Sequence, residues 1–251
     1  MALYMNGQEI SQSSGVPILG VGATEPYIEE IYNSDGQLIS ANMHGYDAIR
    51  SYIFSDCSNL ALTSLPSGIT SIGSNAFQNC PKLALTSLPS GITSIGSNAF
   101  KGCAKLALTS LPSGITSIES YTFYDCSNLA LTSLPSGITS IGIGAFLNCS
   151  KLALTSLPSG ITSISISTFE NCPNLALTSL PSGITSIGFN AFRKCTGLTS
   201  ITFTGTPTSI KNNVFLDCTN LTTINVPWAE GAVANAPWGA TNATINYGYT
   251  G

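Results

Sequence analysis

The chain has 251 residues, of which 8% are charged, and its formal net charge is −4. A typical soluble domain has about a quarter of its residues charged, so this surface is unusually neutral. The sequence has no basic stripe of the kind that binds nucleic acid, and no apolar run approaches the ~20 residues of a membrane span. We therefore expect neither a nucleic-acid partner nor a membrane span.

The first 41 residues are expected to form an N-terminal hairpin cap. Residues 1–15 contain no Lys or Arg, and the apolar segment 16–22 is short and lacks a basic flank, so we expect no secretory signal peptide in this chain. Segments 26–32 and 37–43 flank Asn-Ser-Asp-Gly, which is a hairpin signal. Seven of the twelve acidic residues lie in 1–57, and we interpret them as a solvated acidic cap rather than a cation site.

A repeat follows the cap. The segment LALTSLPSGITSI at 60–72 recurs unchanged at a step of 23 residues, with copies at 83–95, 106–118, 129–141, 152–164 and 175–187. Cysteine keeps the same step from Cys57 to Cys218, and phenylalanine from Phe54 to Phe215, which makes eight units. A fixed period of this size indicates a solenoid, in which each unit buries its apolar face against its neighbours. We predict one solenoid domain over 42–227, with a degenerate first unit at 45–57.

Each part of the unit has a predicted conformation. LALTSL is a β-capable piece, Leu65 to Gly68 reads as a turn with proline at its second position, and 69–72 is a second extended piece. Residues 74–80 read as one helical or 3₁₀ turn with Ser74 as its cap. Equivalent residues of stacked units should form columns at about the 4.8 Å strand spacing. The expected inward set is Leu60, Leu65, Ile69, Ile72, Ala76, Phe77 and Cys80.

The pattern from Cys57 to Cys80, C-x-x-L…L-P-x-x-I-x-x-I-G-x-x-A-F-x-x-C, resembles the BspA-type, or Treponema-type, leucine-rich repeat family. The resemblance covers roughly 42–227. It implies a β-rich, right-handed leucine-rich-repeat solenoid with a parallel β ladder and short helical or 3₁₀ turns. It also implies a bacterial surface protein associated with adhesion.

The six perfect copies depart from that family at one place. The last two units keep the spacing L-x-x-I at Leu198–Ile201 and Leu221–Ile224. The perfect copies place Thr63 where isoleucine is expected and Leu62 one position earlier. Either Thr63 is buried in a hydroxyl ladder or the strand bulges so that Leu62 points inward. We favour the threonine ladder because Leu60 and Leu65 keep their phase on both sides.

The eight cysteines are expected to be free. Cysteines in one column lie near the ~4.8 Å strand spacing with parallel side chains, whereas a disulfide needs Cβ atoms about 3.8 Å apart. We therefore interpret the column as small buried hydrophobes. The chain has no C-x-x-C and a single histidine, so no zinc site is expected.

Residues 228–251 are expected to form a C-terminal cap. One short helix is predicted between Pro227-Trp228 and Pro237-Trp238, with the tryptophans packed over the open end of the core, and a closing strand at 243–249. This tail looks similar to the ends of leucine-rich-repeat proteins from gut Firmicutes and their prophages.

Between 58 and 195 the units differ only near the cysteines. Every charge of that stretch lies in the segment equivalent to Gly73–Ala76 or in the two residues before or after a cysteine, and Tyr121, Tyr124 and Phe189 lie there too. One interpretation makes this variable side a recognition surface. The other is recent duplication followed by drift at solvated positions, and we favour this second interpretation.

No catalytic constellation is visible. The sole histidine, His44, has no nucleophile motif near it, and the adjacent Glu29 and Glu30 point to opposite faces of a strand. We expect no enzyme, no cofactor, and no catalytic, cofactor-binding or metal-binding residues, and the ligand-binding residues remain unknown. The sequence predicts a secreted or surface-exposed bacterial protein that binds a protein or glycan on another surface. The alternatives are a virion-associated phage or prophage tail appendage and a passive spacer.

Overall fold

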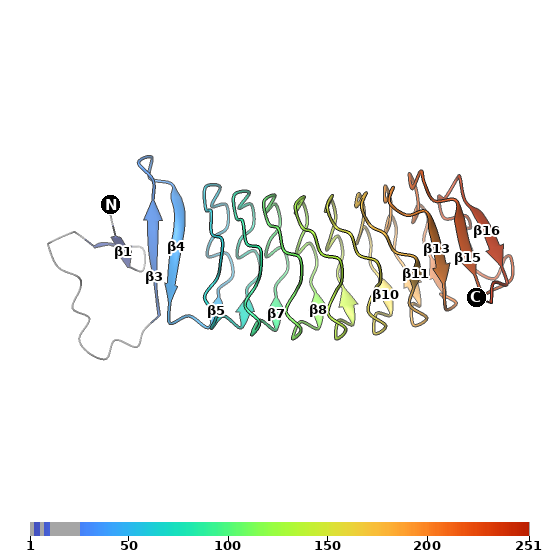
Figure 1. Cartoon of the computed structure of the whole chain (residues 1–251), viewed down its shortest axis with the longest axis horizontal. Coiled ribbons are helices and arrows are strands. Elements are labelled where there is room, and N and C mark those ends of the chain that lie inside the picture. The colour runs from blue at the N-terminus through green and yellow to red at the C-terminus, as the bar shows by residue number, and fades with distance from the viewer. Residues whose placement is uncertain (1–2, 6–7, 11–25, 251) are drawn as a thin grey trace.

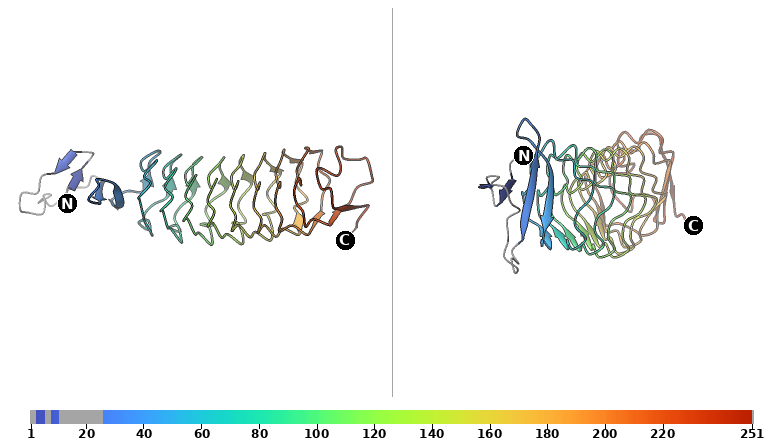
Figure 2. Two further views of the ribbon diagram at one scale, coloured as in Figure 1. Left: turned by 90° about the horizontal axis from the view of Figure 1, so that it is seen from above. Right: turned by 60° about the vertical axis from the view of Figure 1, so that its left-hand side comes forward.

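The computed structural model describes residues 3–5, 8–10 and 26–250. It shows a β-solenoid of about nine coils with a 23-residue step and parallel strands, and no helix occurs in these ranges (Figure 1). Seen from above, the coils follow one another along a single axis from the hairpin to the last strand (Figure 2). The predicted β-rich solenoid is confirmed. We number the coils 1 to 8 by their cysteines, which are Cys57, Cys80, Cys103, Cys126, Cys149, Cys172, Cys195 and Cys218.

The N-terminal end is the predicted hairpin. Strands β1 (Leu3–Met5) and β2 (Gln8–Ile10) pair antiparallel, and so do β3 (Tyr27–Tyr32) and β4 (Leu38–His44). The Asn33 Oδ1 accepts the backbone N–H groups of Asp35 and Gln37 at 3.1 and 2.9 Å, which closes the hairpin turn. The Ala61 N–H donates to the Ile39 carbonyl at 2.9 Å and joins the hairpin to coil 1. Segment 16–22, for which no signal peptide is expected, lies outside the described residues.

Two-residue strands form a parallel ladder along one side of the solenoid. Each pairs with the equivalent residues 23 positions away, Ile49 with Ile72 for example. The ladder has three blocks, β5-β6-β7, β8-β9 and β10-β12-β14. Its strands are β5 (Ala48–Ile49), β6 (Ser71–Ile72), β7 (Ser94–Ile95), β8 (Ser117–Ile118), β9 (Ser140–Ile141), β10 (Ser163–Ile164), β12 (Ser186–Ile187) and β14 (Ser209–Ile210).

The two breaks in this ladder occur at coils 4 and 6, where Glu119 and Ser165 replace the glycine that follows the Ser-Ile pair. A Cβ added at the equivalent Gly96 would lie 2.5 Å from the Ser74 backbone nitrogen, so a side chain there requires the neighbouring backbone to shift. These glycines have negative φ, as expected from their replacement elsewhere, and space rather than backbone conformation selects them. The Ser165 hydroxyl instead donates to the Ile141 carbonyl at 3.0 Å.

The LALTSL side differs from our expectation. A regular sheet occurs only at its C-terminal end, from β11 (Ser179–Leu180) through β13 (Ser200–Phe203) and β15 (Thr223–Val226) to β16 (Thr244–Tyr247). Between the perfect copies, one Ala N–H donates to one Leu carbonyl of the preceding coil at 2.9–3.0 Å, as from Ala84 to Leu62.

The expected threonine ladder is wrong. Leu62 and its equivalents are buried, while Thr63 and its equivalents are exposed. Leu-Ala-Leu alternates like a strand, so Leu60 and Leu62 both face inward. Burying leucine is favourable, whereas burying a hydroxyl without a full set of partners is costly.

The expected helical or 3₁₀ turn at 74–80 is also wrong. Asn75 and Asn79 have φ of 59° and 56°, and a helix does not tolerate left-handed residues. Alternate N–H groups donate to the next coil instead, from Asn75 to Ser97, Phe77 to Ala99 and Asn79 to Lys101. The turn after LALTSL is shifted by one residue, because the Ile69 N–H donates to the Pro66 carbonyl and makes proline the first position.

The core consists of columns of identical side chains. Eight phenylalanines, from Phe54 to Phe215, stack with ring centroids 5.3–5.7 Å apart. The predicted inward set is buried except for Leu65, which is half-buried. All eight cysteines are free, as expected.

The C-terminal end is closed by β16 and by the two tryptophans. The predicted closing strand is present and pairs parallel with β15. Trp228 and Trp238 are buried and pack around Phe203, as expected. The helix predicted between them is wrong, since Gly231 and Asn235 have φ of 82° and 71° and the segment folds as turns. The domain boundaries at 41/42 and 227/228 stay a proposal.

Candidate binding surface

The variable side is the arc of each coil from the position of Gly73 to the second residue after the cysteine, residues 73–82 and their equivalents. Within it the positions of Ala76, Phe77 and Cys80 are buried in coils 2 to 8, and the other residues are exposed or half-buried except Gly144. Apart from Gly144 and the alanine position, which holds the buried Thr122 and Thr168 in coils 4 and 6, the positions that change between coils therefore lie outside the core.

Two columns of this arc have left-handed backbone. Residues at the position of Asn75 have φ of 53–63° and those at the position of Asn79 have φ of 56–75° in coils 1 to 8. Asn, Asp and Gly tolerate this conformation better than other residues do. They fill seven of eight places in the Asn79 column, where Lys194 is the exception, and five of eight in the Asn75 column. The backbone, and not solvent exposure alone, therefore restricts these variable positions.

Polar side chains of the same arc bind their neighbours along the axis. Asn79 donates to Asp56 at 2.8 Å and Asn148 to Asp125 at 2.7 Å. Arg193 lies 3.3 Å from Glu170 and 3.6 Å from Asp217. These groups hold adjacent coils together, and their hydrogen-bonding capacity is partly used.

Apolar residues are exposed in another column of the arc. The position of Ser74 is serine in coils 1 to 4, then Ile143, Ile166 and Phe189, which are 39%, 46% and 45% exposed. Tyr121 of coil 4 is 37% exposed, and its ring lies over Gly144, where a Cβ would be 2.5 Å from it. We call Tyr121, Ile143, Ile166 and Phe189 the apolar stripe. Sequence reasoning placed Tyr121 and Phe189 on the variable side but missed the stripe, whose signal was the change from serine to Ile-Ile-Phe at one position.

The opposite side presents a field of hydroxyl groups. Thr63, Thr70 and their equivalents are exposed in every perfect copy. Several of the Thr70 column donate to the carbonyl of the coil before, as Thr185 does to Thr162 at 3.0 Å. This side carries the same residues in all six copies and so presents no feature that distinguishes one coil from another.

The cysteine column has no reactive character. Each sulfhydryl from Cys80 to Cys218 donates to a phenylalanine carbonyl of the preceding coil, with Sγ···O distances of 2.9–3.0 Å. Burial raises the pKa of the Cys80, Cys172 and Cys218 thiols to about 12. A thiol that keeps its proton is neither a nucleophile nor a metal ligand. Cys57, at the end of the column, is half-buried.

The remaining titratable groups are scattered over the described residues. His44 stacks on Tyr27 with centroids 4.5 Å apart and has its Nε2 3.9 Å from Glu29, at the exposed edge of the hairpin. Across residues 3–5, 8–10 and 26–250, no group of three or more His, Cys, Asp or Glu side chains is placed to hold a metal ion. The same residues contain no apolar helix of a length that could cross a bilayer.

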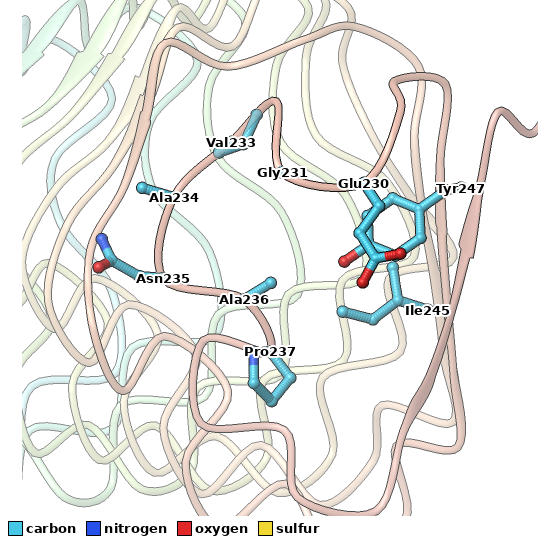
Figure 3. Close-up of a pocket in the computed structure, with 9 residues that line it drawn as sticks. All are labelled: Glu230, Gly231, Val233, Ala234, Asn235, Ala236, Pro237, Ile245 and Tyr247. Carbon is cyan, nitrogen blue, oxygen red and sulfur yellow. The ribbon is translucent and has the colours of Figure 1, made fainter.

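Two of the open hollows formed by the described residues lie at opposite ends of the solenoid. One, of about 430 Å³, is formed by the cap loop, with Glu230 and Tyr247 on one side and Pro237 and Ile245 below (Figure 3). The other, of about 490 Å³, separates β4 from residues 61–66. His44, Ser40 and Ser64 are among the residues that line the second hollow.

Comparison with known protein families finds a match that covers the coils. The family model of the BspA type leucine-rich repeat region, in six copies, matches residues 47–176 and 116–230. No curated protein matches the chain. Among solved structures, a leucine-rich repeat protein from T. pallidum is 25% identical, with a TM-score of 0.51 over 76% of this chain and 86% of that one.

Two further structures share lower identity. A leucine-rich cell surface protein from Faecalibacterium prausnitzii A2-165 is 20% identical over 94% of this chain and 96% of that one, with a TM-score of 0.31. The pneumococcal vaccine antigen PcpA is 21% identical over 77% and 62%, with a TM-score of 0.41. The 23-residue period, the stacked phenylalanine and cysteine columns and the family match over 47–230 agree, and this chain belongs to the BspA-type leucine-rich repeat family.

Proposed function

We propose that this chain is a non-enzymatic binding protein of a bacterial surface, and that the variable side binds a protein partner. One observation carries the proposal. In coils 2 to 7 every charged residue and every exposed aromatic or isoleucine lies on the variable side, while the opposite side repeats the same serines and threonines. A rigid solenoid that presents different side chains from successive coils suits recognition of an extended surface.

Membership in the family and the surface or antigen descriptions of two structural neighbours support a location outside the cell. The left-handed columns weaken the interpretation that the exposed positions drift freely, because backbone geometry restricts which residues occupy the Asn75 and Asn79 columns. The serine-to-isoleucine change remains outside that restriction and supports selection for contact.

The test is a co-sedimentation assay with the fluorescently labelled chain. Beads coated with mucin or with an extracellular-matrix protein, and intact bacterial cells, would be incubated with wild type, a Tyr124→Ser/Leu147→Ser variant of the variable side, and a Thr132→Lys/Thr155→Lys variant of the opposite side. Circular dichroism would check that each is folded. We expect binding to one bead type that the first variant weakens and the second retains.

Other results have defined meanings. Loss of binding only in the threonine variant would place the contact on the hydroxyl side and overturn the assigned surface. Binding to bacterial cells alone would favour a phage tail appendage. Binding to none of these materials would favour the spacer.

A further inference from the structure

We propose that the apolar stripe is a docking site for an amphipathic α-helix of a protein partner, lying along the solenoid axis with its N-terminus toward Glu119 and its C-terminus toward Lys211. The inference rests on the proposed binding function and specifies the chemistry of the partner. It follows from the spacing of the stripe, the charges at its two ends and its area.

The stripe is continuous over four successive coils. Tyr121, Ile143, Ile166 and Phe189 come from coils 4 to 7, one from each. The phenylalanines of the same coils stack with centroids 5.5–5.6 Å apart, which gives the step between neighbouring coils on this side. An α-helix advances 5.4 Å per turn, so a helix with apolar residues at i, i+4, i+7 and i+11 presents one side chain to each coil. An extended strand repeats its same-face side chains at ~6.6 Å and loses register within three coils.

Two opposite charges flank the stripe. The column beside it, at the position of Gly73, carries Glu119 in coil 4 and Lys211 in coil 8, with Gly142, Ser165 and Gly188 between them. Glu119 accepts one hydrogen bond from Ser117 at 2.7 Å, and in the described part of the chain neither Glu119 nor Lys211 has an ion-pair partner. A helix carries partial positive charge at its N-terminus and partial negative charge at its C-terminus. Four steps of about 5.6 Å separate the two charges by roughly 22 Å, the length of ~15 helical residues.

The area argues against a second copy of this chain as the occupant. With about 200 Å² for a fully exposed large side chain, the four exposed fractions amount to roughly 300–400 Å². A stable dimer buries about 800 Å² on each partner. An apolar area of this size, edged by Ser163, Ser167 and Asn190, suits the narrow face of a single helix.

The test uses a defined probe. A fluorescein-labelled, acetylated and amidated 16-residue Ala/Gln peptide with Leu at i, i+4, i+7 and i+11 would be titrated with the full chain, and fluorescence anisotropy would report binding. The control peptide has the same composition with its leucines distributed around the helix. We expect the striped peptide to bind at least tenfold more tightly than the control.

The chain offers its own matched variant. Ile143→Ser/Ile166→Ser/Phe189→Ser restores the residue that coils 1 to 4 carry at this position, so the coils have a natural precedent for folding. We expect it to weaken striped-peptide binding at least tenfold, whereas Tyr249→Ser, which removes an exposed aromatic elsewhere, leaves it unchanged. Glu119→Gln/Lys211→Gln is expected to weaken binding about threefold. A nitroxide on the peptide N-terminus should broaden the amide signals of Ser120 and not those of Asn212.

Several results would overturn the inference. Equal binding of both peptides would indicate non-specific apolar contact. If sedimentation detects concentration-dependent dimers that the triple variant abolishes, the occupant of the stripe is a second copy of this chain. If a neutral oligosaccharide binds wild type and the triple variant abolishes that binding, the occupant is a glycan. If beads bind wild type and the triple variant alike while the peptide binds neither, the helix site fails and the proposed function stands. If wild type binds neither beads nor peptide, both fail.

Discussion

The side chains at the left-handed positions show how the backbone selects residues on an exposed surface. Each coil needs two residues with positive φ, four positions apart, because that conformation directs alternate N–H groups toward the next coil. Asparagine and aspartate meet this need and also bond to each other along the column, as Asn171 does to Asn148 at 3.0 Å. Tyr52, Tyr121, Ser167 and Lys194 occupy these positions against their intrinsic preference.

Lys194→Asn should therefore stabilise the protein by about 1 kcal/mol, since the left-handed conformation costs about 1–2 kcal/mol in ordinary residues. Urea denaturation would measure the gain. Lys105→Asn is the matched control, because Lys105 is exposed without positive φ, and its free energy of unfolding should stay within about 0.5 kcal/mol of wild type. A Lys194 variant no more stable than its control would contradict the assigned strain.

At this scale the sequence predicted which residues are apolar and buried, but not which of two neighbours faces inward. Leu62 and Thr63 are adjacent, and the direction of either depends on where the chain departs from regular alternation between Leu60 and Leu65. That choice is made by packing between coils, which a single repeat does not contain. The left-handed turns were missed for a related reason: asparagine suits both a cap and a positive φ, and the bonds that decide between them run to the next coil.

Among the elements, the cysteine column makes the free energy of unfolding depend on pH in the alkaline range. The thiol pKa in the folded protein is raised by burial to about 12 at Cys172, against an ordinary value of 9.0. At a pH between these two pKa values, the thiol is deprotonated in the unfolded chain and protonated in the folded chain. The free energy of unfolding therefore falls as the pH rises. Each such thiol should contribute a slope of about −1.4 kcal/mol per pH unit above pH 9, and should have no effect below it.

Urea denaturation from pH 8 to 11 would measure this slope. Cys172→Ala is expected to reduce the steepness by about one thiol's contribution, even though it lowers stability at every pH. Tyrosines and lysines also titrate in this range, and the comparison of slopes cancels them. An unchanged slope in the variant would show that this thiol does not stay protonated in the folded state.

The ladder of Ser-Ile strands offers a second element to test. At each of its two breaks, a replaced glycine is accompanied by a threonine three residues later: Glu119 with Thr122, and Ser165 with Thr168. Both threonines are buried and donate a hydrogen bond to a carbonyl of the preceding coil. In coil 8 the ladder is intact although Lys211 occupies the glycine position. The position equivalent to Thr122 and Thr168 is Val214 in that coil. Replacement of glycine alone is thus insufficient to break the ladder.

Glu119→Gly/Thr122→Ala should join β7 to β8 and restore two backbone hydrogen bonds. We expect the amides of Thr116 and of residue 119 to become protected in hydrogen exchange, with a gain of about 1–2 kcal/mol in the free energy of unfolding. Lys105→Asn again serves as the control. Amides that exchange as fast as in wild type would assign the break to another cause.

The period, the inward columns, the hairpin and the closing strand could all be predicted from the sequence, because each depends on local pattern. The apolar stripe could not be recognised in the same way. Its members are 22 or 23 residues apart in sequence, and only the stack brings Tyr121 over Gly144 beside Ile143. The breaks in the ladder depend on a distance between backbones that no propensity describes.

The whole molecule is a one-dimensional stack in which each coil contacts its neighbours. Deletion of residues 83–105 removes one complete unit and brings coil 2 against coil 4. Coils 2 and 3 share the segment GSNAF, so the new junction has nearly the same contacts as the old one. We expect a folded, cooperative protein whose urea m-value is lower by about a tenth, in proportion to the surface lost.

Circular dichroism and urea denaturation would check this prediction. Deletion of the 12 residues 83–94, which removes half of a unit, is the control and should prevent the following coils from stacking in phase. Aggregation of the 23-residue deletion would contradict the description of the solenoid as interchangeable units.

The sameness of the inner columns has a consequence for folding. Any perfect copy can seat on any other with equivalent core contacts, so registers displaced by one or more coils are nearly degenerate in their apolar packing. Apart from the buried Thr122 and Thr168 in the alanine column, what distinguishes the native register is outside the core, in pairs such as Asn148 with Asp125 and Arg193 with Glu170, and in the two caps. The variable side therefore also determines the stacking register. Its side-chain pairs select, among six equivalent copies, the neighbour on which each coil stacks.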